Sequence, residues 1–125
     1  MEANYLRVTE EELNWLNKSN QAAIVRKVSD IEEYEDFEED GFEYRILLLD
    51  KECNNIVALA YLVSTHRNTP KQAWKNFGSK YGCTKKNFDK YVENAPKVKT
   101  YVLKFCHFYD KAIPLNLVYD LIDDL

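Results

Sequence analysis

Apolar and polar residues alternate, or apolar residues run together, in five short stretches of the chain. Strict alternation over Tyr5-Leu6-Arg7-Val8 is typical of a short strand with one buried face. Small and β-branched residues dominate Ala22-Ala23-Ile24-Val25, and such residues fit the pleated, half-buried surface of a strand. The predicted strands cover residues 5–8, 22–28, 44–50, 56–65 and 98–108, and the third and fourth form a hairpin around a turn at 51–55.

Three positions carry the pattern of a helix start. Thr9 followed three residues later by Glu12 is a capping box, in which each residue bonds to the backbone of the other. Thr69 precedes Pro70, and proline is favoured in the first turn of a helix. Thr84 is a good cap for a further helix. These signals predict helices over 10–17, after Thr69 and after Thr84, and apolar spacing predicts one more over 116–125.

The elements follow one another in the order strand, helix, strand, acidic segment, hairpin, two helices, strand and helix. Five strands separated by long connections favour a partly open barrel whose edges are closed by helices. No internal repeat or linker marks a second domain. We therefore expect one α+β domain over residues 1–125: a small, partly open β-barrel of about five strands with flanking helices and an acidic excursion at 30–43.

Composition narrows the class of protein. Of 125 residues, 46% are hydrophobic and 14% aromatic, while Gly and Pro number only three each, which speaks against disorder and against a disulfide-rich scaffold. The chain has no apolar run of 18 or more residues and no basic leader followed by an apolar stretch. We therefore expect a cytoplasmic protein with no membrane partner.

Metal and cofactor chemistry finds no support in the sequence. Cys53, Cys83 and Cys106 are an odd number of scattered thiols without the spacing of metal ligands, and His66 and His107 are far apart. The chain also lacks a glycine-rich phosphate loop and the G-x-S-x-G and H-E-x-x-H motifs. We expect three reduced thiols, no metal and no cofactor.

Charge is strongly segregated along the chain, although the net charge is only −4. Residues 30–43 contain nine acidic side chains and no basic one. Residues 67–104 contain ten Lys or Arg against two acidic residues, which leaves +8. Binding responds to the local potential, so a basic face of this kind indicates a nucleic-acid partner despite the acidic total.

An ordered set of short patterns resembles a known superfamily. Ile56–Tyr61 reads Ile-Val-Ala-Leu-Ala-Tyr, Thr69–Trp74 reads Thr-Pro-x-x-x-Trp, and Phe88–Tyr91 reads Phe-Asp-x-Tyr. The strand Tyr101–Phe105 is followed by Ile113-Pro114. In this order, over residues 5–115, the chain resembles PUA-like domains, the group that includes ASCH and EVE domains. The resemblance implies a pseudo-barrel that binds RNA or DNA, with a modified or unpaired base as its specific ligand.

The catalytic signature of one branch of that group is not retained. ASCH members that hydrolyse acetylated cytidine carry G-x-K-x-x-E-x-R at the junction of the first helix and the next strand. The matching stretch here ends at Arg26 but has Ser19, Gln21 and Ile24 in place of Gly, Lys and Glu. Gln cannot act as a base or nucleophile, so the departure favours a binding protein. A residual amidohydrolase is the one enzymatic alternative.

Candidate ligand-binding residues lie at that junction and along the basic stretch. Cations would contact phosphates, hydroxyl and amide groups would read a base edge, and an aromatic ring would stack on a base. His66 is the residue that would titrate near neutral pH and sense an anion. The candidates are Lys18, Ser19, Asn20, Arg26, Arg45, Ser64, Thr65, His66, Arg67, Trp74, Lys75, Lys85 and Lys86.

Each candidate has a purely structural alternative. Arg26 and Arg45 are also expected as strand residues paired with the acidic segment. Residues 64–67 also fit a plain connection between a strand and a helix. Trp74 has the spacing of a core residue, and lysines on helix faces commonly serve solubility.

The acidic segment has three interpretations. Residues 30–43 are a solvated excursion, a cover that competes with nucleic acid for the basic face, or a mimic of nucleic-acid charge that binds a protein partner. Ile31, Tyr34 and Phe37 recur at a spacing of three and predict that the segment is pinned to the body of the domain. The third interpretation makes the chain a protein-interaction module instead of a nucleic-acid-binding one.

Overall fold

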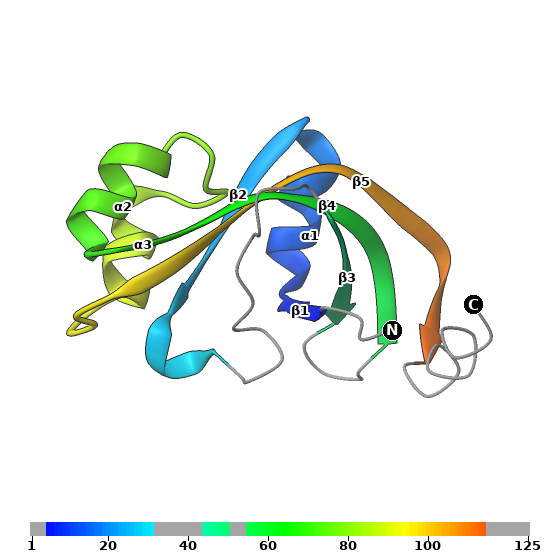
Figure 1. Ribbon diagram of the computed structural model, residues 1–125, viewed down its shortest axis with the longest axis horizontal. Helices are drawn as coiled ribbons and strands as arrows, with labels where there is room; N and C mark the ends of the chain where they lie inside the picture. Colours follow the sequence, from blue (N-terminus) through cyan, green and yellow to red (C-terminus); the bar gives the residue numbers. More distant parts are fainter. Residues whose placement is uncertain (1–4, 32–43, 51–54, 115–125) are drawn as a thin grey trace.

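The computed structural model describes residues 5–31, 44–50 and 55–114, and its centre is one strongly curved five-stranded sheet (Figure 1). The first two strands in the sheet pair in parallel and all other neighbours are antiparallel. The sheet does not close, because its two edge strands do not pair with each other. In order across the sheet, the strands are β1 (Tyr5–Val8), β3 (Tyr44–Asp50), β4 (Asn55–Asn68), β5 (Val98–Pro114) and β2 (Gln21–Lys27).

Helix α1 (Glu10–Lys18) connects the two edge strands. The predicted capping box is confirmed: Glu12 N–H donates to Thr9 Oγ1 (3.1 Å), and Thr9 N–H donates to Glu12 Oε1 (2.9 Å). These two bonds satisfy backbone donors that the first turn of a helix cannot pair. The helix therefore begins where the sequence predicts and lies against the concave side of the sheet (Figure 1).

Two further helices lie together at the far end of the molecule, between β4 and β5 in the chain (Figure 1). Helix α2 (Pro70–Phe77) begins with proline after the N-cap Thr69, whose side chain accepts from Gln72 N–H in a second capping box. Helix α3 (Lys85–Tyr91) begins after Thr84, whose hydroxyl accepts from Asn87 N–H (3.2 Å). All three predicted helix starts are thus confirmed.

Strand β2 is buried on both faces and separates two apolar clusters. Ala22 and Ile24 belong to the cluster that α1 covers inside the curved sheet. Ala23 and Val25 belong to the cluster under α2 and α3, with Phe88 and Val98. Since side chains alternate along a strand, four consecutive apolar residues place β2 between two layers.

The two longest strands extend beyond their predicted ends. β4 continues to Asn68, three residues past the prediction, and β5 continues to Pro114 instead of stopping at Phe108. The two strands pair along almost their whole length, with three shifts in register. Partner strands satisfy the backbone of polar residues as well as apolar ones, so the strand persists where the hydrophobic pattern has stopped.

Several expectations fall outside the described residues: the turn at 51–54, most of the acidic segment and the helix over 116–125. At the start of the acidic segment, β2 is followed by one turn of 3-10 helix, Val28–Asp30. Within the described ranges, no helix is long and apolar enough to cross a membrane.

Candidate functional site

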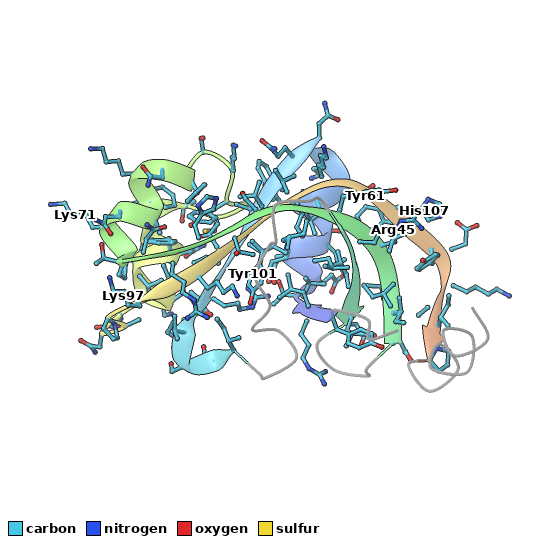
Figure 2. The ribbon with its side chains drawn as sticks, in the orientation of Figure 1. Arg45, Tyr61, Lys71, Lys97, Tyr101 and His107 are labelled. Carbon is cyan, nitrogen blue, oxygen red and sulfur yellow. The ribbon has the colours of Figure 1, made fainter. Side chains whose placement is uncertain are left out.

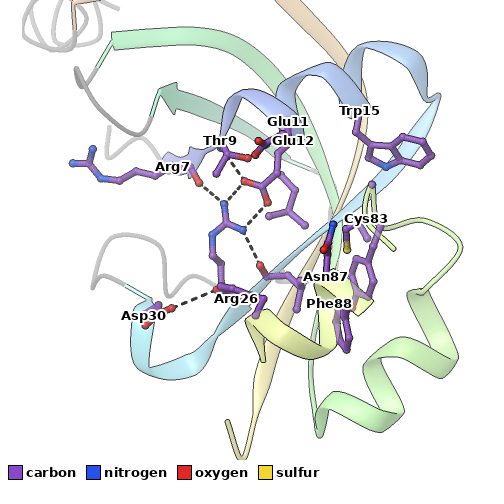
Figure 3. A pocket seen from close by; sticks show the side chains of 16 residues that line it. Arg7, Thr9, Glu11, Glu12, Trp15, Arg26, Asp30, Cys83, Asn87 and Phe88 are labelled. Atoms are coloured by element: carbon purple, nitrogen blue, oxygen red, sulfur yellow. Dashed lines mark hydrogen bonds and ion pairs between the residues drawn. The ribbon is translucent and has the colours of Figure 1, made fainter. Parts of the chain in front are cut away.

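A cleft of about 730 Å³ opens between α1, β2 and α3 (Figure 3). Glu11, Glu12 and Trp15 of α1 form one wall. Residues of α3 form the opposite wall, and residues 23–26 of β2 lie between the two walls. The short segment Tyr81–Cys83 closes the end near Trp15. The cleft therefore lies along the open side of the barrel.

Arg26 is held at the edge of this cleft by four contacts (Figure 3). Its Nη2 and Nη1 atoms lie 2.6 and 2.7 Å from the two carboxylate oxygens of Glu12. Nη2 also donates to the backbone oxygen of Arg7 in β1, and Nη1 donates to that of Val25 in β2, each at 2.7 Å. The guanidinium group thus joins α1 and the two edge strands, which do not pair with each other, and we call this set the Arg26 clamp.

The expected pairing of Arg26 with the acidic segment stays a prediction, because most of that segment lies outside the described residues. Within the described residues, Arg26 binds a carboxylate of α1, that of Glu12, which also completes the capping box. The two side chains are only 17% and 23% exposed, so their bidentate contact is poorly screened by water. Arg26 is therefore positioned chiefly by the fold, with its charge balanced by Glu12.

Trp15 fixes the other end of the cleft. Its indole Nε1 donates to the backbone oxygen of Lys80 (2.7 Å), and that oxygen also accepts from Ala23 N–H (3.1 Å). The indole covers Gly82 so closely that a Cβ atom there would lie 2.4 Å from Trp15 Cγ. Glycine is required at this position because no side chain fits between the backbone and the ring.

Two tyrosine hydroxyls and one cysteine thiol in the cleft are neutral at pH 7. Burial raises the pKa of Tyr81 to about 12, and its hydroxyl is 2.6 Å from the Thr100 hydroxyl. Burial also raises the pKa of Tyr91, whose hydroxyl accepts from Lys27 N–H (3.0 Å). The Cys83 thiol has a pKa raised by burial and by the nearby Glu12 carboxylate. The cleft therefore offers aromatic rings and neutral hydrogen-bonding groups.

Exposed cations gather at the end of the molecule formed by α2 and α3, where Lys71 and Lys97 point into solvent (Figure 2). Asp89 and Glu93 are the acidic residues within this part of the sequence, and Asp89 forms an ion pair with Lys85. We call the following exposed residues the basic end: Arg67, Lys71, Lys75, Lys85, Lys86, Lys90 and Lys97.

Lys99 belongs to the same basic stretch of sequence but not to this surface. It is fully buried, and its Nζ lies 5.3 Å from the centre of the Tyr101 ring. Part of the +8 charge counted along the sequence therefore lies inside the domain. The surface potential of the basic end is correspondingly smaller than the count predicts.

Trp74 sits at the base of the basic end. Its ring packs against Phe88 (centroids 5.0 Å apart) and Tyr81 (6.1 Å), as expected of a core residue. Its other surface is half-exposed, with Lys85 Nζ 5.7 Å from the ring. Trp74 therefore combines the packing role and the partial exposure that the sequence left as alternatives.

The structure places residues 64–67 inside β4, and the expected strand-to-helix connection is wrong. These residues pair with β5, from Ser64 opposite Val102 to Arg67 opposite Lys99. His66 Nε2 lies 2.8 Å from Ser64 Oγ, and its ring centre is 4.7 Å from that of Phe77 in α2. His66 is thus packed beneath α2, while Thr65 pairs opposite Tyr101.

The remaining candidates do not meet in one cleft. Lys18, Ser19 and Asn20 lie at the turn where α1 joins β2, and none of them lines the cleft that contains Arg26. Arg45 lies on β3, exposed, with its guanidinium carbon 5.9 Å from the Tyr61 ring centre. Of the thirteen candidates, Arg67, Trp74, Lys75, Lys85 and Lys86 come together at the basic end.

Several cleft residues were not identified from the sequence. The capping box accounts for Glu12 in the sequence, so its contact with Arg26 was not predicted. Asn87 and Tyr91 line the cleft from α3, and their spacing of four residues is the signal that places them on one helix face. Cys83 and Trp15 both line the cleft, with Trp15 packed over Gly82, and no local pattern in the sequence predicts this arrangement.

The comparisons with known proteins identify the fold. No family model and no curated protein matches the chain. Among solved structures, it is similar to ASCH from Zymomonas mobilis, with 13% identity, a TM-score of 0.68 and coverage of 97% of this chain and 79% of that one. Two mutant forms of the same protein match with TM-scores of 0.66 and 0.69. The chain has the PUA-like fold of an ASCH domain.

A second likeness agrees with this fold. The N-terminal domain of McrB from Staphylothermus marinus, also PUA-like, matches with 14% identity and a TM-score of 0.50, over 99% of this chain and 86% of that one. At such identities the likeness shows the fold alone. Within the PUA-like fold, Gln21 and Ile24 point to opposite faces of β2: Gln21 is exposed, whereas Ile24 is 2% exposed in the core.

Proposed function

We propose that this PUA-like domain binds single-stranded RNA or DNA, with the sugar-phosphate backbone on the basic end and an unpaired or modified base in the cleft. The observation that carries the proposal is that α3 contributes to both surfaces. Asn87 and Tyr91 line the cleft, and the exposed Lys86 and Lys90 each precede one of them by one residue. Phosphate contacts and base contacts would therefore be made by adjacent faces of one helix.

The cleft suits a base better than a phosphate. Its charged lining residues are Arg7 and Arg26 against Glu11, Glu12 and Asp30, so it has no surplus of positive charge. Arg26 is moreover neutralised by Glu12 within hydrogen-bonding distance. A phosphate would meet net repulsion there, whereas a neutral base would be desolvated at a low electrostatic cost.

Aromatic walls and neutral donors are the features with which proteins read exposed bases. Trp15, Tyr91 and Cys83 line the cleft, and the Cys83 thiol is neutral. Asn87 adds an amide that both donates and accepts hydrogen bonds. These groups support specific recognition of a base edge in addition to stacking.

Binding is favoured over hydrolysis by two of the three positions that depart from the ASCH signature, Gln21 and Ile24. The Gln21 amide cannot act as a general acid or base, and its Oε1 accepts a hydrogen bond from Lys80 Nζ (2.9 Å). Ile24 is buried in the core. The Arg of the signature, Arg26, serves in the clamp.

The first test is binding of the purified chain to short single-stranded RNA and DNA across a salt series. We expect affinity to fall steeply as salt rises, because each neutralised phosphate releases counterions. The double substitution Lys86→Glu with Lys90→Glu should weaken binding at least tenfold and reduce the salt slope by about two. Lys85 is a poorer choice, because its reversal would also place a like charge opposite Asp89.

For the single substitution Lys86→Glu, the matched control is Lys111→Glu, which makes the same charge change at an exposed site near the end of β5. It alters the net charge without touching α3, so affinity should change little. Equal losses from both variants would mean that only net charge matters. Unchanged binding by the Lys86 and Lys90 variant would overturn the proposed interface.

A second candidate function follows from the nine carboxylates of residues 30–43. Such a density of negative charge suits a module that binds the basic groove of a protein partner. Deleting residues 32–43 separates the two candidates. Nucleic-acid binding that persists or improves supports the first, and loss of function without any nucleic-acid binding by the intact chain supports the second.

A further inference from the structure

A row of polar and aromatic side chains crosses the outer face of the sheet, away from the cleft. Arg45 in β3 is opposite Tyr61 in β4, Tyr61 is opposite Lys104 in β5, and Lys104 is opposite Gln21 in β2. Residues directly opposite each other on neighbouring strands point to the same face. We call this row, continued by Lys80, the sheet track.

The register shows that the track faces outward. The next residues along the same strands, Ile46, Leu62 and Leu103, are buried in the core beneath α1. Because side chains alternate along a strand, their neighbours in the track point to the opposite side. Arg45 and Gln21 are accordingly exposed. Figure 2 shows Arg45 and Tyr61 together on the outer side of the sheet, far from Lys71 and Lys97.

The chemistry of the track is that of a surface for single-stranded nucleic acid. Tyr61 is a half-exposed aromatic ring on the sheet, with the Arg45 guanidinium carbon 5.9 Å from its centre on one side and Lys104 in register on the other. An aromatic platform between two cations offers stacking to a base and charge to the phosphates on either side of it. The row itself contains no carboxylate.

Through Lys80, the track also reaches the segment between α2 and α3, the helices that form the basic end. Lys80 Nζ donates to Gln21 Oε1 (2.9 Å) at the edge of the sheet. Lys80 in turn lies in the segment between α2 and α3, where its backbone oxygen holds Trp15. With neighbouring strands about 4.8 Å apart, the row from Arg45 to Gln21 spans about 14 Å, a reach of a few nucleotides.

We propose that the sheet track is a second contact surface for the same nucleic-acid strand, which leaves the basic end at Lys80, crosses Lys104 and stacks a base on Tyr61. This inference rests on the proposed function and adds a path for the strand beyond α3. It predicts that long strands gain affinity from a surface that short strands do not reach.

The test compares oligonucleotides of about 5 and about 15 nucleotides, lengths that bracket the site sizes of single-strand-binding folds. Affinity for the full chain is measured by fluorescence anisotropy at two salt concentrations. Tyr61→Ala should weaken binding of the longer strand about tenfold and leave the shorter one within about twofold. Tyr61→Phe, which keeps the ring, should restore the affinity for the longer strand.

Arg45→Gln provides an independent variant at an exposed position. It should reduce the salt slope for the longer strand by about one, without changing binding of the shorter strand. Because this substitution removes no buried contact, it decides the question even where Tyr61→Ala lowers the Tm.

The outcomes separate this inference from the function on which it rests. If both variants bind the longer strand like the unaltered chain while Lys86→Glu with Lys90→Glu weakens both lengths, the track is wrong and the proposed function stands. If Tyr61→Ala loses affinity equally for both lengths, Tyr61 has a structural role and the proposed second contact surface is wrong. If the unaltered chain binds neither length at low salt, the proposed function fails and the track fails with it.

Discussion

Two groups of cationic side chains flank the cleft, and the fold uses them differently. Arg26 is mostly buried, and its guanidinium makes contacts to Glu12, to the backbone of β1 and to that of β2. Lys86 and Lys90 are exposed on α3. Cations beside a cleft therefore indicate a binding surface only if they are not already paired within the fold, as Arg26 is with Glu12.

Removing the Arg26 clamp should produce the largest change in stability. Arg26→Ala leaves the Glu12 carboxylate partly buried without its partner and separates the two edge strands, so we expect a loss of about 3 kcal/mol in the free energy of unfolding. Urea denaturation measures this loss. Lys18→Ala, at an exposed position on α1, is the matched control and should change stability by less than about 0.5 kcal/mol.

The same variant also tests whether the Arg26 guanidinium contacts phosphate. Where Arg26→Ala is still folded, the salt slope for nucleic-acid binding should match that of the unaltered chain, since the guanidinium charge is already neutralised by Glu12. A reduced slope would show that Arg26 contacts phosphate, contrary to its assignment to the clamp.

The second prediction concerns the opposite end of the cleft. Gly82→Ala would place a methyl group 2.4 Å from Trp15 Cγ, so the indole has to move and its hydrogen bond to Lys80 weakens. We expect a loss of about 2 kcal/mol, measured by thermal unfolding, together with a shift in tryptophan fluorescence. Ser79→Ala, in the same segment but exposed, is the control. An unchanged Tm would show that the cleft wall is looser than the contact implies.

The third and smallest effect depends on pH. The pKa of Tyr81 is raised from 10.0 to about 12 by burial, so the folded state keeps this hydroxyl neutral where the unfolded state has begun to ionise. The stability that the neutral hydroxyl contributes is therefore complete below pH 10 and is lost as pH rises toward 12. Stability should fall more steeply over this range in the unaltered chain than in Tyr81→Phe, as urea denaturation at a series of pH values measures.

Tyr81→Phe also removes the hydrogen bond to Thr100, and this sets the baseline for the measurement. The loss of this hydrogen bond is independent of pH below 10, so it lowers the free energy of unfolding by the same amount throughout that range. The slope of stability against pH above 10 then measures the ionisation of Tyr81. Parallel curves for the two proteins above pH 10 would show that Tyr81 titrates with an ordinary pKa.

Local signals in the sequence predicted the framework well. Each helix start depends on a threonine and the residues within three positions of it, and all three starts are where Thr9, Thr69 and Thr84 predict them. The five strands were also predicted, since alternation and β-branched residues report on burial of one face. The PUA-like fold was predicted from the resemblance of an ordered set of short patterns to that superfamily.

The cleft was not predictable in the same way, because its contacts join residues far apart in the chain. Trp15 and Lys80 are 65 positions apart, and Glu12 and Arg26 meet only because α1 folds back along β2. Lys99 illustrates the reverse problem. Its position in a basic stretch predicts exposure, yet Lys99 is fully buried, with its Nζ 5.3 Å from the centre of the Tyr101 ring.

The way in which β4 and β5 pair has a consequence for how this domain can vary. Asn68 and Val98 are directly opposite each other, so the segment that carries α2 and α3 leaves the sheet and returns to it at adjacent points. A segment attached in this way behaves as a removable insert: its length and charge can be altered, or the segment replaced, while the strands keep their register. Two constraints on such exchange remain. Ala23 and Val25 on the outer face of β2 need an apolar cover, and Trp15 and Ala23 need the acceptor that the Lys80 backbone oxygen now provides.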